Sequence, residues 1–257
     1  MATPSMERSI FPADVETRLK EEFFHGARDG FFVDVGANEP TDGSQTWHLE
    51  ELGWRGVVIE PQPRLAQKLK EQRRAAVFAC ACSSPQNAGK MLPFQTAGIF
   101  SSLNPDFFVA GMRKEEIIEV PVRTLDDILV EATAPSPIDL LAIDVESHEI
   151  DVLNGLTLTR WRPRLIFIED TVLNLRLHRL LRSRGYKWLR RTGINSWYVP
   201  AASPLSVGPW GRWQFFRKYY LGTPFRNLRE YKRRKREQFR ARLGHSAPGT
   251  ASSKAGS

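Results

Sequence analysis

Short apolar runs that alternate with polar helical stretches dominate the first half of the chain. The pattern predicts strands over 31–35, 56–60 and 75–82, with helices over 44–52 and 64–73 between them. A strand–helix–strand–helix–strand order with such short connections is typical of a parallel sheet with right-handed crossovers. We therefore expect an α/β domain that begins at the first of these strands.

The same alternation resumes after residues 83–117, a stretch rich in Pro and Gly that predicts a loop-rich insertion with one short strand. Thr124 is suited to cap the helix that follows. The later elements that the pattern predicts are strands over 117–122, 138–145 and 165–169, helices over 125–131, 148–153 and 174–184, and an antiparallel hairpin over 186–190 and 196–199. Together they predict a mostly parallel seven-stranded sheet with an antiparallel closing strand and helices on both faces.

Length and composition divide the chain into three parts. With 257 residues, 41% of them hydrophobic, it suits one α/β domain over 31–200 with an N-terminal helical lead-in over 1–30. No apolar run approaches the ~20 residues that cross a bilayer, and no signal peptide is apparent, so we expect a cytoplasmic protein. Cys80 and Cys82 are alternate residues of one predicted strand, which makes them poor partners for a disulfide or a shared metal.

The third part, residues 201–257, carries the positive charge. It has 13 Lys and Arg against 2 Asp and Glu, whereas the whole chain has a net charge of +8. Between 210 and 242, aromatic residues precede a basic block. This order favours an anionic membrane surface, which would make the protein peripheral at a membrane, over nucleic acid, for which no known module is visible. A solvated helix whose aromatics pack on the domain is the default alternative. The last residues are Ser, Ala, Gly and Pro and predict disorder.

Polar residues with binding chemistry follow two neighbouring strands. Asp34, Gly36 and Asn38 come at the end of the first strand, and Glu60 ends the second. In a parallel sheet these ends meet in one crevice, where a glycine admits close backbone approach and an acid can accept hydrogen bonds from ribose hydroxyls. Each residue alone is commonly structural, but the two strand ends together favour a nucleoside-binding crevice. The second and third glycines of a dinucleotide loop are missing, which disfavours a nicotinamide cofactor.

A second group of acids follows the strand predicted over 138–145. Asp144, Glu146 and Glu149 lie within six residues, a crowding that a cation, a hydrogen-bonding ligand or solvent must relieve. One hypothesis places Asp144 and Glu146 against a charged cofactor group or an acceptor hydroxyl. The alternatives are a divalent metal bound by Asp144, Glu146 or Glu149 and, for Glu149, an ordinary helix start. His148 is a candidate general base, against the alternative of an exposed histidine on a first helical turn.

These motifs resemble the FkbM family of methyltransferases in order and spacing. The matching segments are Phe32-Val-Asp-Val-Gly-Ala-Asn38, Gly53-Trp-Arg-Gly-Val-Val-Ile-Glu-Pro-Gln-Pro63, Arg123-Thr-Leu-Asp-Asp-Ile-Leu129 and Ile138-Asp-Leu-Leu-Ala-Ile-Asp-Val-Glu146. The resemblance covers about residues 31–198. It implies a Rossmann-like class I methyltransferase fold, S-adenosylmethionine as methyl donor, and usually a hydroxyl acceptor on a glycan or another small natural product.

The resemblance also assigns roles by position. The cofactor-binding set is Asp34, Gly36, Asn38, Glu60 and Asp144, and the catalytic set is Asp144, Glu146 and, on chemical grounds alone, His148. The family usually has glycine where this chain has Ser147, which puts a close backbone approach there in question. A divalent metal stays open. A protein that binds the cofactor without catalysis, as a scaffold tethered by its basic tail, is the alternative function.

The acceptor pocket is the least defined part of the site. Glu169 and Asp170 end the next strand and are expected to line it. Aromatic residues of the 83–117 insertion are expected to shape it, namely Phe94, Phe100, Phe107 and Phe108.

Overall fold

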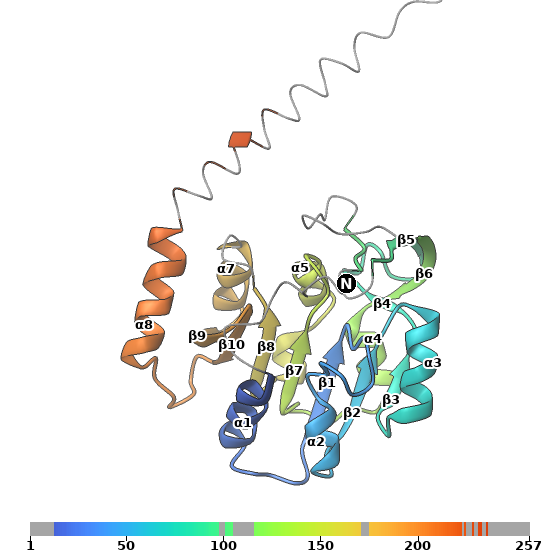
Figure 1. The fold of residues 1–257 in the computed structure, drawn as a ribbon, viewed down its shortest axis with the longest axis horizontal. Helices are drawn as coiled ribbons and strands as arrows, with labels where there is room; N and C mark the ends of the chain where they lie inside the picture. Colours follow the sequence, from blue (N-terminus) through green and yellow to red (C-terminus); the bar gives the residue numbers. More distant parts are fainter. Residues whose placement is uncertain are drawn as a thin grey trace, which may run out of the picture.

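A seven-stranded sheet forms the centre of the computed structural model, which describes residues 13–97, 101–104, 116–170, 175–222, 224, 228, 231, 232 and 235. The strand order is β3-β2-β1-β7-β8-β10-β9 (Figure 1). The strands are β1 (Phe31–Val35), β2 (Arg55–Ile59), β3 (Ala76–Phe78), β7 (Leu140–Ile143), β8 (Leu165–Glu169), β9 (Tyr186–Thr192) and β10 (Asn195–Pro200). All neighbouring strands run parallel, except that β10 is antiparallel to both β8 and β9. The predicted sheet and its antiparallel closing strand are confirmed.

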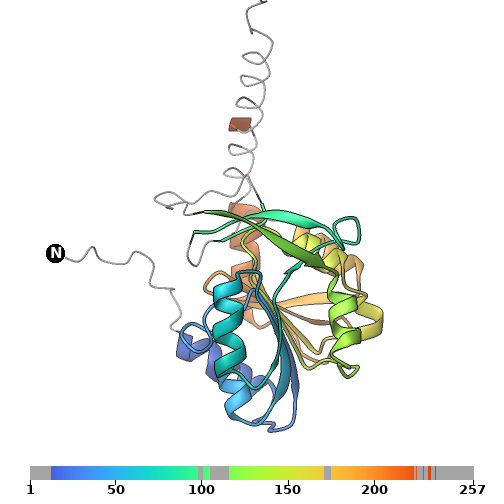
Figure 2. The same ribbon diagram turned by 90° about the vertical axis from the view of Figure 1, so that its right-hand side faces the viewer.

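Helices cover both faces of this sheet because its strands bury side chains on both sides (Figure 2). One face packs on α1 (Ala13–Phe23), α2 (Trp47–Glu51) and α3 (Pro63–Gln72), and the other on α4 (Leu125–Glu131), α5 (Glu149–Asn154), α6 (Leu158–Trp161) and α7 (Leu175–Ser183). Strand β1 shows the alternation: Phe32 belongs to the first apolar core, whereas Val33 belongs to the second. The predicted helices on both faces are confirmed.

The single strand predicted over 75–82 is wrong. Strand β3 pairs with β2 in the main sheet, whereas β4 (Ala81–Cys82) pairs with β6 (Ile117–Arg123) in a second, three-stranded sheet that also contains β5 (Met91–Gln95). The chain leaves the main sheet after Phe78, and its next backbone groups find partners in the insertion instead. An apolar run in the sequence shows burial, but it does not show which strand supplies the hydrogen bonds.

Local boundaries differ from the prediction where a side chain competes for backbone groups. The helix predicted from residue 44 begins only at Trp47, because the Ser44 hydroxyl accepts hydrogen bonds from the Thr46 and Trp47 amides at 3.4 and 3.2 Å. The predicted cap of α4 is confirmed, since the Thr124 hydroxyl accepts from the Asp127 amide at 3.1 Å.

Two C-terminal elements pack beside the sheet edge. Helix α8 (Pro209–Phe216) continues into one π-helical turn, Arg217–Leu221 (Figure 1). The Gln214 side chain pairs with the backbone of β9, donating to the Arg191 carbonyl at 2.9 Å and accepting from its amide at 3.3 Å. Lys218 is buried and forms an ion pair with Asp170. Among the described residues, no helix combines the length and apolar character needed to cross a membrane.

Candidate functional site

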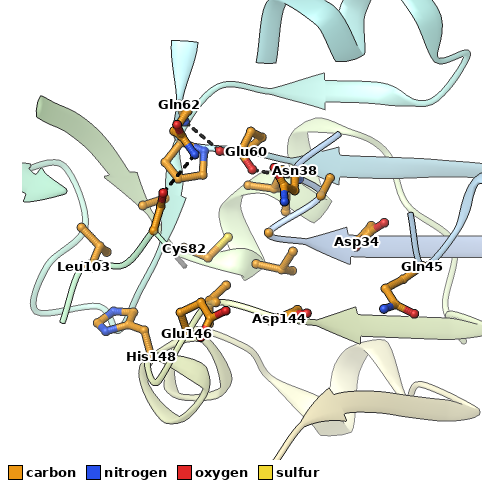
Figure 3. A pocket seen from close by; sticks show the side chains of 18 of the residues that line it. Asp34, Asn38, Gln45, Glu60, Gln62, Cys82, Leu103, Asp144, Glu146 and His148 are labelled. Carbon is orange, nitrogen blue, oxygen red and sulfur yellow. Dashed lines mark hydrogen bonds between the residues drawn. The ribbon is translucent and has the colours of Figure 1, made fainter. Parts of the chain in front are cut away.

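A cavity of about 520 Å³ opens at the carboxyl ends of β1, β2 and β7 (Figure 3). The seven residues that the sequence singled out as cofactor-binding or catalytic all line it: Asp34, Gly36, Asn38, Glu60, Asp144, Glu146 and His148. The structure thus brings both motif groups to one site, as expected for strand ends of a parallel sheet. Phe94 of the insertion also lines the cavity, whereas Phe100, Phe107 and Phe108 lie outside the described residues.

The turn after β1 depends on a glycine at one position. Gly36 has φ +85°, and a Cβ built on it would lie 1.9 Å from the backbone oxygen of Asp144. Its amide donates to the Ile59 carbonyl at 3.0 Å, so the turn is joined to β2 on its other side. The glycine lets the ends of β1 and β7 come together. The sequence had instead suggested that this glycine allows a ligand to approach the backbone.

Glu60 presents a carboxylate whose orientation is fixed. The side chain is buried, and its two oxygens accept hydrogen bonds from the Asn38 and Gln62 amides at 3.0 and 2.9 Å. Burial raises the pKa of Glu60 to about 7, although both hydrogen bonds act in the opposite direction. A carboxylate has about four acceptor positions, so Glu60 can still accept hydrogen bonds from hydroxyl groups in the cavity.

Asp34 is held by a buried polar network behind the cavity. The Thr46 hydroxyl donates to its carboxylate at 2.7 Å, and Arg73 donates to the same hydroxyl at 3.0 Å. Burial raises the pKa of Asp34, while the Thr46 hydrogen bond and the positive charges of Arg73 and Lys20 lower it. The network therefore supports a partly compensated negative charge at the end of β1.

Lys20 is a member of this network that sequence reasoning missed. It comes from α1, is buried, and donates to the backbone and side-chain oxygens of Gln45 at 2.9 and 2.8 Å. Burial lowers its pKa to about 8. Gln45 lines the cavity, so the lead-in helix supports the site through it. No local motif marks Lys20, because its partners lie more than twenty residues away along the chain.

Asp144 and Glu169 share a hydrogen bond at the ends of β7 and β8. Burial, reinforced by the charges of nearby acids, raises the pKa of Glu169 to about 10, and burial raises that of Asp144 to about 6. Glu169 is therefore the protonated partner at neutral pH and donates to Asp144. Carboxylate oxygens of this pair and of Glu146 all lie within 4.8 Å of one another. Among the residues that the structure describes, this acidic group has the spacing of metal ligands. It contains Glu169, whereas the metal hypothesis from the sequence named Glu149.

Glu149 has a structural role in the turn that precedes α5. Its buried carboxylate accepts from the Ser147 amide at 2.9 Å. Glu146 and Ser147 both have left-handed backbones, with φ +50° and +74°, and the Ser102 hydroxyl donates to the Glu146 carbonyl at 2.6 Å. This geometry favours the helix-start interpretation of Glu149. It also explains why a glycine suits position 147.

His148 faces the cavity with one ring nitrogen engaged. Its Nε2 lies 3.0 Å from the Ser83 hydroxyl, and its Nδ1 lies 3.7 Å from the Asp151 carboxylate. Burial lowers the pKa of His148, which favours the neutral ring. With Nδ1 protonated toward Asp151, Nε2 accepts from Ser83 and is the nitrogen that can take a proton. Sequence reasoning found His148 but missed Ser83, which is distant in sequence.

Residues 34–188 match the family model described as the methyltransferase FkbM domain. The chain belongs to the FkbM methyltransferase family. This agrees with the motifs in the sequence and with the topology of the sheet. The matched region contains all seven site residues that the sequence singled out, whereas Lys20 lies before it.

This member of the FkbM family is similar to two solved structures. One is the methyltransferase FkbM from Methylobacillus flagellatus KT, at 18% identity and a TM-score of 0.43, with 67% of this chain and 44% of that chain covered. The other is a Pyrococcus horikoshii protein named for RNA methyltransferase activity, at 10% identity and a TM-score of 0.40, with 77% and 91% covered. This chain thus spans less than half the length of the Methylobacillus protein. No curated protein matches the chain.

Proposed function

We propose that this FkbM methyltransferase transfers a methyl group from S-adenosylmethionine to a hydroxyl oxygen of a glycan or another natural product. The observation that carries the proposal is the oriented Glu60 carboxylate that lines a cavity formed by three parallel strand ends. A volume of about 520 Å³ lies within the range of about 300–1,000 Å³ that is usual for small-molecule sites.

The residues of the cavity fit the parts of this cofactor. Glu60 would accept hydrogen bonds from the ribose hydroxyls, which favours its charged form despite its burial. Asp34 and Asp144 would attract the positive ammonium and sulfonium groups, and Asn38 and Gly36 shape the loop beside them. A pyrophosphate fits less well, because the loop after β1 lacks the second and third glycines of a dinucleotide-binding loop. This supports S-adenosylmethionine over a dinucleotide.

His148 provides the base for a hydroxyl acceptor in this proposal. A bound cofactor would supply a methyl group that its sulfonium already activates, so alignment of the acceptor oxygen is the main requirement. An acceptor hydroxyl that replaces Ser83 at Nε2 would give its proton to His148 as the oxygen attacks. Figure 3 shows His148 and Glu60 on different sides of the cavity, with Glu146 beside His148 and Asp144 farther along, at the end of β7.

Calorimetry with S-adenosylmethionine tests the cofactor assignment. We expect Glu60→Ala to weaken binding at least tenfold, because one buried acceptor of two hydroxyl hydrogen bonds is lost. Glu71→Ala is the matched control, since Glu71 is an exposed acid on α3. Equal affinity in both variants would contradict the assignment.

Release of S-adenosylhomocysteine separates catalysis from the scaffold alternative. We expect release with hydroxylated glycans or natural products and none without an acceptor. Tight cofactor binding without release for any hydroxyl acceptor would favour a non-catalytic role. Ser147 is weak support for that role, because its backbone already adopts the left-handed conformation for which glycine is suited.

A further inference from the structure

One face of α8 is fully used in packing on the methyltransferase domain. A Cβ on Gly211 would lie 3.1 Å from the Leu189 carbonyl, which shows how closely the helix approaches β9. The Phe215 ring packs 5.3 Å from His178 and 5.5 Å from Trp188, centroid to centroid. The residues on this inner face, three or four positions apart, are Gly211, Gln214, Phe215 and Lys218.

The opposite face of α8 carries exposed aromatic rings that stack along the helix. Trp213 and Phe216 have centroids 5.9 Å apart, and Phe216 and Tyr220 have centroids 5.2 Å apart, with interplanar angles of 26° and 23°. Their exposed fractions are 47%, 43% and 65%, and Trp210 and Leu221 beside them are also exposed. A helix that is apolar on two faces requires apolar surroundings on both. The inner face packs on the domain, whereas no described residue covers the outer face.

Basic residues border this outer face and continue beyond it. Arg212 and Arg217 are exposed on α8 and its π-helical turn. Between residues 210 and 242 the sequence has twelve Lys and Arg, against Glu230 and Glu237 as the acids. Trp and Tyr beside Lys and Arg are the combination that suits the headgroup region of an anionic bilayer, where rings enter the interface and charges meet lipid phosphates.

Two other occupants fit less well. A second copy of the chain would bring the same positive charge against the face. Single-stranded nucleic acid would use aromatic faces as stacking platforms, but Phe216 already stacks between Trp213 and Tyr220.

We propose that the outer face of α8 docks this methyltransferase on the surface of an anionic lipid membrane. The rings of Trp213, Phe216 and Tyr220 enter the headgroup region, and the flanking basic residues contact the lipid phosphates. The buried ion pair between Lys218 and Asp170 anchors this surface one residue from Glu169 of the candidate site. Docking therefore holds the site at a fixed orientation to the membrane.

Flotation of the full chain with lipid vesicles tests the proposal. We expect flotation with vesicles of phosphatidylcholine mixed with phosphatidylglycerol, little flotation with phosphatidylcholine alone, and weaker binding as salt rises. The combined variant Trp213→Ser, Phe216→Ser and Tyr220→Ser should bind at least tenfold more weakly. The control is Ile117→Ser with Val130→Ser, which removes exposed apolar side chains elsewhere and should bind as the native chain does.

Further measurements make the outcome decisive. The single variant Tyr220→Ser, at the most exposed ring of the stack, should show a smaller loss in the same direction, and unchanged S-adenosylmethionine affinity reports an intact fold. Arg212→Gln with Arg217→Gln should weaken binding to the anionic vesicles only. Unchanged flotation of the combined aromatic variant would overturn the proposal. So would equal binding to neutral vesicles, or a native chain that dimerises through this face and does not float.

Discussion

The backbone carbonyl of Asp144 occupies the position where a side chain on Gly36 would begin, 1.9 Å from the ideal Cβ. This contact joins the ends of β1 and β7, and it places the first acidic motif against the second. The two motifs are more than one hundred residues apart in the sequence. Their junction therefore determines whether the cavity has its observed shape.

Gly36→Ala should destabilise the fold by about 2 kcal/mol or more, because it adds a clash with backbone to the cost of a left-handed alanine. Gly89→Ala is the matched control: Gly89 has φ +77°, and nothing lies within 4 Å of its ideal Cβ. Urea unfolding gives the free energy of unfolding of both variants, and the difference between them measures the clash. The control loses only about 1 kcal/mol, the cost of a left-handed alanine. Equal losses would show that the carbonyl contact is unimportant.

Cofactor affinity should depend on pH through Glu60. Burial raises its pKa to about 7, so the empty site is partly protonated at neutral pH, and ribose hydroxyls would favour the charged form. Binding then releases a proton, and affinity should rise with pH below about 7, by up to tenfold per unit, and level off at higher pH. Without cofactor the sign is opposite: stability falls as pH rises from 4.5 to about 7, because the folded state retains the proton.

Calorimetry across this pH range checks the first effect. Glu60→Gln should bind more weakly and lose most of the pH dependence. The control is Glu149→Gln, which removes another buried carboxyl whose pKa is raised to about 7 but which serves the turn at Ser147. A flat profile in the native chain would contradict the ribose role of Glu60.

The sequence predicted the parts of the site that lie at strand ends, because strand ends are local. The strand–turn signals around Gly36, Glu60 and Asp144 placed these residues in one crevice once a parallel sheet was inferred. Lys20 and Ser83 were missed, because their roles come from contacts with distant elements. The run over 75–82 was misread for the same reason, since pairing between β4 and β6 depends on residues about forty positions away.

Ser147→Gly should stabilise the protein by about 0.5–1 kcal/mol. Ser147 has φ +74°, and relief of a left-handed backbone exceeds the entropy that glycine loses on folding. Ser206→Gly is the control, since Ser206 is exposed and is not left-handed, and it should be neutral or destabilising. Denaturant unfolding compares the two variants. A loss of stability in Ser147→Gly would indicate that the serine hydroxyl has a role of its own.

Glu169→Gln should retain activity within a few-fold of the native chain. Glu169 is the protonated partner of Asp144, and a glutamine amide can donate the same hydrogen bond. Asp144→Asn should reduce turnover more than cofactor affinity. A chelator should leave the native activity unchanged. If a divalent cation neutralises this group instead, Glu169→Gln and the chelator should both abolish activity, and added Mg²⁺ should restore it after chelation.

His148→Gln should lower kcat by about 10²–10⁴-fold and leave S-adenosylmethionine affinity unchanged, because the variant removes the base but not the cofactor contacts. His25→Asn is the control, at an exposed position outside the cavity. Asp151 raises the pKa of His148, so Asp151→Asn should move the acidic limb of the kcat/KM profile to lower pH. This pH shift would show that Asp151 acts on the His148 ring, because loss of a merely structural residue would leave the pH profile in place. Full activity of His148→Gln at every pH would contradict the role of His148 as base. Methyl transfer would then depend on alignment of the acceptor alone.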